Sequence, residues 1–222
     1  MVKHFERDLS QLKEKLMMMA DLAMANIYLA VKSLVERNPQ KFEEVFAQEQ
    51  RINALQIEID NLCLELIALH QPVAGDLRLL ASAMKINTEL ERIGDLAINI
   101  IQASRRLIAQ PELKPLIDVP KMAELVQLMV RDSIDGFVWR NSQLARDVLK
   151  RDDTIDELKD RTYDELINCI AKDGSTAPRA LQLILVSRHL ERIADHATNI
   201  AEDVVYLVEG VDVRHHSESS RT

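Results

Sequence analysis

The stretch LERIGDLAINI, Leu90 to Ile100, returns one hundred residues later as LERIADHATNI, Leu190 to Ile200, with eight of the eleven positions identical. Each copy carries a glutamate, an aspartate and an asparagine at intervals of four residues: Glu91, Asp95 and Asn99, then Glu191, Asp195 and Asn199. Residues four apart lie on one face of an α-helix. The repeat therefore predicts two equivalent helices, each presenting a row of side-chain oxygens.

The composition of the chain favours an all-α fold. Aromatic residues make up only 4%, Gly and Pro number 5 and 6, and the rest is rich in Leu, Ile, Ala, Met, Glu, Lys and Arg, which favour helices. A length of 222 residues suffices for two domains of about 100 residues, each burying a core. The internal repeat favours that division.

Apolar residues recur at steps of three and four in six segments, which predicts two tandem antiparallel three-helix bundles. We expect a first three-helix repeat over 1–110, a linker over 111–120 that contains three prolines, a second repeat over 121–210, and a disordered tail over 211–222. Asn38 is predicted to cap a second helix that begins at Pro39. The apolar seam of that helix is predicted to run through Val45, Ile52, Leu55, Ile59, Leu62, Leu66 and Leu69.

Charge and sequence signals exclude several classes of protein. The net charge is −8, so nucleic acid should be repelled and is not an expected partner. Two cysteines without C-x-x-C spacing suit reduced thiols in the cytosol. No signal peptide is recognised, and uninterrupted apolar runs such as 183–186 fall far short of the about 20 residues that span a bilayer. We expect a cytoplasmic protein that reaches a membrane only through a partner.

The heptad register of the third helix turns Glu91 and Asp95 away from the bundle core. One interpretation is a solvated acidic face, in which Arg92 neutralises Asp95 and Arg192 neutralises Asp195. The second helix of each repeat favours a different interpretation. Like charges four residues apart cost a helix roughly 0.2–0.5 kcal/mol, and a bound cation would remove that cost.

Candidate metal ligands therefore come from two helices in each repeat. Glu49 and Asn53 in the first repeat match Asp152 and Asp156 in the second, at an offset of 103 residues. Carboxylate and amide oxygens suit hard metal ions, and the absence of Cys and His from these positions argues against a closed zinc-finger site. The predicted metal ligands are Glu49, Asn53, Glu91, Asp95, Asp152, Asp156, Glu191 and Asp195.

Other chemistry has weaker support. A di-iron carboxylate enzyme would need Glu-x-x-His motifs facing inward, and the chain has none. His196 is matched by Leu96 in the first copy, so we expect a surface histidine there. Met17 to Met19 is expected to form a packed seam with an exposed edge, and His215-His216 is too short to define a site. No phosphate-binding loop, dinucleotide fingerprint or nucleophile elbow is present, so we do not expect an enzyme.

Two copies of E-R-I-[GA]-D-x-A-x-N-I, with QPVAGDLRLL ahead of the first, resemble the PhoU family over nearly the whole chain. The resemblance implies a homodimer and multinuclear metal clusters at the E/D-x-x-x-D pairs, holding iron or zinc, with manganese or magnesium as further candidates. Asp152, Asp156, Glu191 and Asp195 fit the fully acidic pattern. Asn53 replaces an acid in the first repeat and leaves the occupancy of that site open.

The resemblance also implies a regulatory function. PhoU proteins look like cytoplasmic adaptors, peripheral to the inner face of the plasma membrane, between the ATPase subunit of the phosphate ABC transporter and the sensor histidine kinase of the phosphate regulon. They restrain uptake and repress the regulon when phosphate is plentiful. A helical scaffold without metal and, more distantly, a carboxylate–metal oxidase are the alternatives that the residues leave open.

Overall fold

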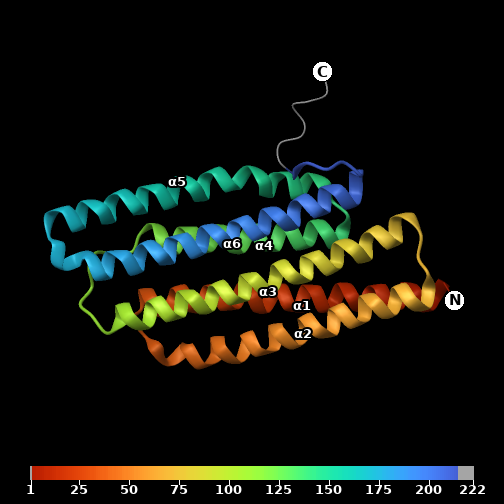
Figure 1. The fold of residues 1–222 in the computed structure, drawn as a ribbon, viewed down its shortest axis with the longest axis horizontal. Coiled ribbons are helices and arrows are strands. Elements are labelled where there is room, and N and C mark those ends of the chain that lie inside the picture. The colour runs from red at the N-terminus through yellow and green to blue at the C-terminus, as the bar shows by residue number, and fades with distance from the viewer. Residues whose placement is uncertain (1, 215–222) are drawn as a thin grey trace, which may run out of the picture.

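The computed structural model describes residues 2–214, and over this range six α-helices form two layers that lie side by side (Figure 1). The first repeat consists of α1 (Val2–Val35), α2 (Phe42–His70) and α3 (Ala74–Ile108), and the second of α4 (Asp118–Trp139), α5 (Ser142–Lys172) and α6 (Ala177–Glu209). The predicted fold class, two tandem three-helix bundles, is confirmed. His215-His216 and the remainder of the predicted tail beyond Arg214 lie outside the described residues.

The two repeats share one continuous apolar core. α3 packs against α6 and α1 against α4 across the junction, while α2 and α5 pack mainly against helices of their own repeat. Apolar residues at steps of three and four in α1 and α6 are buried, as Leu16, Ile27, Leu190 and Ile200 illustrate with no exposed surface. The four central helices therefore fix the register between the repeats, and α2 and α5 are the outer helices.

Equivalent turns end the first helix of each repeat. Asn38 caps the 3-10 turn Pro39–Lys41 with its side chain, so α2 begins at Phe42 rather than at Pro39 as predicted. Asn141 does the same for α5, accepting a hydrogen bond of 3.1 Å from the backbone of Leu144. These caps satisfy backbone donors that have no partner within the helix.

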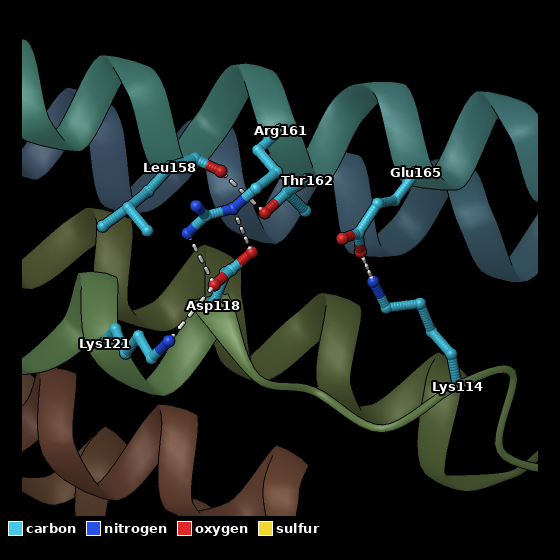
Figure 2. A network of polar contacts seen from close by, with 7 residues as sticks. All are labelled: Lys114, Asp118, Lys121, Leu158, Arg161, Thr162 and Glu165. Carbon is cyan, nitrogen blue, oxygen red and sulfur yellow. Dashed lines mark hydrogen bonds and ion pairs between the residues drawn. The ribbon is translucent and has the colours of Figure 1, made fainter.

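The linker ends earlier than the prolines suggest, because α4 begins at Asp118. Pro120 lies in the first turn, where a helix needs no backbone N–H donor. Figure 2 shows how this segment is fastened to α5. The guanidinium group of Arg161 donates two hydrogen bonds of 2.9 Å to the Asp118 carboxylate, and Lys114 pairs with Glu165. The linker is therefore held against the second repeat.

The predicted seam of α2 is wrong at its end. Leu69 is 68% exposed, while Cys63 is fully buried. The inward stripe runs through Ile59 and Cys63 and continues to His70, whose ring lies 5.0 Å from that of Phe5. Because His70 occupies the inward position of the last turn, Leu69 faces solvent.

α1 contains a stretch, His4–Val35, that is long enough to cross a membrane and whose most apolar window has a mean hydropathy of 1.3. A search for uninterrupted apolar runs does not detect this stretch, because charged and polar residues interrupt it. Within the bundle, 61% of its most apolar window is buried, which accounts for its hydropathy.

Met19 faces the core and Met17 and Met18 are 41% and 48% exposed, so the expected packed seam with an exposed edge is confirmed.

Candidate metal centre

Four carboxylates gather where α5 and α6 of the second repeat meet. Asp152 and Asp156 come from α5, Glu191 and Asp195 from α6, and we call this set the second acidic groove. The pKa of Asp152 is raised to about 6 by burial and by the nearby negative charges of Asp195, Asp156, Asp153 and Glu191. The helices thus bring together the side chains that the sequence paired, and the carboxylates repel one another.

Lys159 supplies part of the missing positive charge. Its Nζ lies 2.7 Å from Asp156 Oδ1 and 3.4 Å from Glu191 Oε1, so one ammonium group bridges α5 and α6. The hydrogen bond to Asp156 is the main reason why the pKa of Lys159 is raised. Within residues 2–214 no ion pair reaches Asp152, and burial and Glu191 raise the pKa of Asp195. The second acidic groove therefore keeps an excess of negative charge.

The first acidic groove, formed by Glu49 and Asn53 of α2 with Glu91 and Asp95 of α3, carries less charge. The amide of Asn53 donates a hydrogen bond to the carboxylate of Glu49, where the second repeat has two repelling aspartates. Burial and Asp95 raise the pKa of Glu91, and Glu49 adds to the effect. The Asn53 substitution therefore relieves repulsion within α2 without a metal ion.

Close helix packing sets the width of the first groove. A Cβ on Gly94 would lie 3.2 Å from Cδ1 of Ile52, tighter than an ordinary van der Waals contact. The glycine of the repeated motif thus lets α2 approach α3 at the level of the acidic residues. Ala194 occupies the corresponding position in the second repeat and is fully buried.

The alternative interpretation, in which an arginine neutralises the aspartate of each acidic row, is not supported by the ion pairs of the described residues. Arg92 approaches Glu91, at 3.6 Å, rather than Asp95. Among the described residues, no ion pair joins Arg192 to Asp195. Arg92 and Arg192 are exposed, whereas Glu91, Asp95 and Glu191 are partly buried.

His196 and Asn199 both contact Glu89, which the sequence did not indicate. Nδ1 of His196 lies 2.6 Å from Oε2 of Glu89 on α3, and the amide of Asn199 donates to the same oxygen at 3.1 Å. The expectation of a surface histidine is therefore wrong, since this side chain is only 18% exposed and bridges the two repeats. Asn199 faces Glu89 and does not continue the oxygen row.

The donor set fits a hard or borderline cation, but the side chains are not arranged around one. Among residues 2–214, no three His, Cys, Asp or Glu side chains converge closely enough to hold a metal ion. Each groove nevertheless supplies oxygen ligands from two helices, with raised carboxylate pKa values that a cation would reverse. Burial raises the pKa of the Cys63 thiol to about 12, so this cysteine is unsuited to be a ligand.

Fold and site together define an internally duplicated helical protein with one acidic groove in each repeat. Comparison with known proteins identifies it further. The PhoU domain matches twice, over residues 16–104 and 119–204, which correspond to the two three-helix repeats. The chain belongs to the PhoU family.

Relatives match over nearly their whole length. The chain is 37% identical to the phosphate-specific transport system accessory protein PhoU homolog of Clostridium acetobutylicum, covering 95% of this chain and 97% of that one. The homolog from Aquifex aeolicus is 40% identical, with 94% and 95% covered. The crystal structure of PhoU from Pseudomonas aeruginosa superposes with a TM-score of 0.89 at 33% identity, covering 93% of this chain and 100% of that chain.

Proposed function

We propose that this protein is an accessory protein of a phosphate-specific transport system, which restrains phosphate uptake and represses the phosphate regulon when phosphate is plentiful. The observation that carries the proposal is the match to the C. acetobutylicum accessory protein homolog over 95% of this chain and 97% of that one. A similar structure, from Streptococcus pneumoniae, is described as a phosphate transport system regulatory protein and superposes with a TM-score of 0.85 at 28% identity.

The proposed role is that of a non-enzymatic adaptor. It acts in the cytoplasm, at the inner face of the plasma membrane, between the ATPase subunit of the phosphate transporter and the sensor histidine kinase of the regulon. Long exposed helix faces suit this role, because a helical repeat protein offers an extended surface to more than one partner. We propose a homodimer as the working form.

Metal binding is the chemical part of the proposal. Asp152, Asp156, Glu191 and Asp195 would hold a cluster of iron or zinc ions in the second groove. Glu49, Glu91 and Asp95, with the amide oxygen of Asn53, would form a weaker site in the first groove. The metal would supply the positive charge that both grooves lack and would cross-link the outer helix of each repeat to its motif helix.

Lys159 would compete with a metal ion in the second groove. Its ammonium group contacts Asp156 and Glu191, two of the proposed ligands, at 2.7 and 3.4 Å. A metal ion that takes the same oxygens, Oδ1 of Asp156 and Oε1 of Glu191, would displace this group, because a lysine and a cation cannot share the same lone pairs. Metal binding would thus release Lys159 to solvent.

Deletion of the gene tests the regulatory proposal. We expect phosphatase expression to stay high in phosphate-rich medium in the deletion strain, and to be repressed again by a plasmid copy of the wild-type gene. A copy carrying Glu191→Ala and Asp195→Ala tests the metal site, with Asp164→Asn, an exposed aspartate of α5, as the matched control. Normal repression in the deletion strain would contradict the regulatory role.

A further inference from the structure

α1 and α4 pack side by side and present a broad face with exposed apolar side chains. Met17, Tyr28 and Val35 of α1 and Leu128 and Trp139 of α4 are between 40% and 75% exposed. We call the surface that carries these five residues the α1–α4 face. An apolar surface of this extent on a soluble protein marks a contact with another molecule.

The register of the two helices places Leu128 at the centre of this face. Lys13 Nζ donates a hydrogen bond of 3.0 Å to the backbone oxygen of Val138. Further along, Val35 of α1 and Pro120 of α4 line the same groove, which has a volume of about 310 Å³. The helices therefore run antiparallel, and Leu128 lies about halfway between these two points.

The charges on the outward stripe of α4 are ordered around Leu128. Lys121 and Glu124 precede it by seven and four residues, and Arg131 and Asp135 follow it by three and seven. Such intervals put all five residues on one side of the helix. Within residues 2–214, none of Glu124, Arg131 and Asp135 forms an ion pair. Each half of the stripe thus carries a positive and a negative charge, and three of these four charges have no ion-pair partner.

A second α4, placed antiparallel across a two-fold axis at Leu128, would match each of these charges with its opposite. Lys121 would be level with the partner's Asp135. Glu124 lies about 6 Å before the axis and Arg131 about 4.5 Å after it, so Glu124 would meet the partner's Arg131 on the same side of the seam. A two-fold interface requires this kind of self-complementary surface.

The same axis brings exposed apolar residues of the face together. Trp139 and Ile117 are 75% and 63% exposed and lie eleven residues on either side of the axis, so Trp139 would be level with the partner's Ile117. On α1, the partner's Met17 would be level with the groove that Tyr28 and Val35 line. A flexible thioether side chain suits an irregular apolar groove of this kind.

The size of the α1–α4 face fits a stable dimer. α4 has 22 residues and is therefore about 33 Å long. Two adjacent helices are about 20 Å wide, which gives on the order of 700 Å² for each protomer. This value is close to the roughly 800 Å² that each partner buries in a standard stable interface.

We propose that the α1–α4 face binds a second copy of this chain across a two-fold axis at Leu128. The inference rests on the homodimer of the proposed function and assigns its interface. The Glu124–Arg131 pair occurs twice in such a dimer, once on each side of the axis. No predicted metal ligand lies on α1 or α4, so the interface can be tested separately from metal binding.

Charge reversal tests the interface in solution. Sedimentation velocity on the full-length chain, with a chelator present, should show a dimer. Arg131→Glu and Glu124→Arg should each raise the dissociation constant at least about tenfold, because each places like charges together twice. The double variant should restore the dimer, which a folding defect would not do. Arg188→Glu, at an exposed arginine of α6 without an ion pair in the described chain, is the matched control and should remain dimeric.

A cysteine cross-link tests the position of the axis. In a Cys169→Ser background, Leu128→Cys should form a disulfide-linked dimer under mild oxidation, seen on a non-reducing gel, because each copy meets its own counterpart at a two-fold axis. Leu185→Cys, at an exposed leucine of α6, should not cross-link.

The outcomes separate this interface from the proposed function. A wild type that is monomeric at every concentration overturns both the interface and the homodimer. A dimer that neither charge reversal weakens, or one that Leu128→Cys does not cross-link, overturns this interface and leaves the homodimer standing. The regulatory role is decided by the deletion test alone.

Discussion

Replacing Asp152 with asparagine should stabilise the metal-free protein at neutral pH. The pKa of Asp152 is raised from 3.8 to about 6 by burial and by the surrounding carboxylates, so ionising it in the folded state costs free energy. At about 1.4 kcal/mol for each pKa unit, the cost would be about 3 kcal/mol in a fully buried site. Asp152 is only partly buried, and solvent screening lowers the expected gain to about 1 kcal/mol.

The gain should depend on pH with a defined sign. Because the folded-state pKa lies above the unfolded value, the stability of the wild type relative to the variant is greatest below pH 3.8 and falls as the pH rises toward about 6. The advantage of Asp152→Asn should therefore be absent near pH 3.8, grow up to about pH 6 and stay constant above it. Urea unfolding followed by circular dichroism, with a chelator present, measures this directly.

Asp164→Asn is the matched control for the Asp152 experiment. Asp164 lies on the same helix, is exposed, and makes no ion pair among the described residues. It should leave the free energy of unfolding unchanged within about 0.5 kcal/mol. A loss of stability in Asp152→Asn at pH 7.5, or an equal gain in Asp164→Asn, would refute the inference that clustered carboxylates destabilise the second groove.

Three further changes test other contacts. Lys159→Met should lower the free energy of unfolding of the metal-free protein by about 1 kcal/mol. It should also raise the metal affinity measured in a competition titration with a chromogenic chelator. An unchanged affinity would count against displacement of the ammonium group. Glu89→Gln should cost about 1–2 kcal/mol in urea unfolding, since it removes the negative charge from the hydrogen bond with His196 between the repeats, and an unchanged midpoint would contradict it. Arg161 lowers the pKa of Asp118, so Asp118→Asn should lower the free energy of unfolding by roughly 0.5–1 kcal/mol at pH 7. This loss should disappear as the pH falls below the pKa of an ordinary aspartate. A loss that does not depend on pH would exclude this ion pair as its source.

Helical periodicity was sufficient to predict the architecture. The seam of α6 through Leu190, Ile193 and Ala197 is buried as expected, because a long amphipathic helix in a bundle has one apolar stripe and one place to bury it. Prediction failed at the end of α2, where Leu69 and His70 compete for one inward position. Periodicity alone does not decide between two neighbouring residues when a partner ring from another helix selects one of them.

Contacts between helices were beyond the reach of the sequence. The offset of 103 residues identified Asp152 and Asp156 as the counterparts of Glu49 and Asn53, and the structure brings their helices to the motif helices. Nothing in the sequence indicated that Lys159 lies between Asp156 and Glu191. Its counterpart in the first repeat is a glutamine, so the repeat itself gave no reason to single it out.

A crystal structure with anomalous scattering measured at the iron and zinc absorption edges tests the metal proposal most directly. Protein purified without chelator should show peaks in the second acidic groove, within coordination distance of Asp152, Asp156, Glu191 and Asp195, with Lys159 displaced. Peaks in the first groove should be weaker, because Asn53 already satisfies Glu49. An absence of peaks from both grooves, with Lys159 still bound to Asp156 and Glu191, would contradict metal binding by these carboxylates.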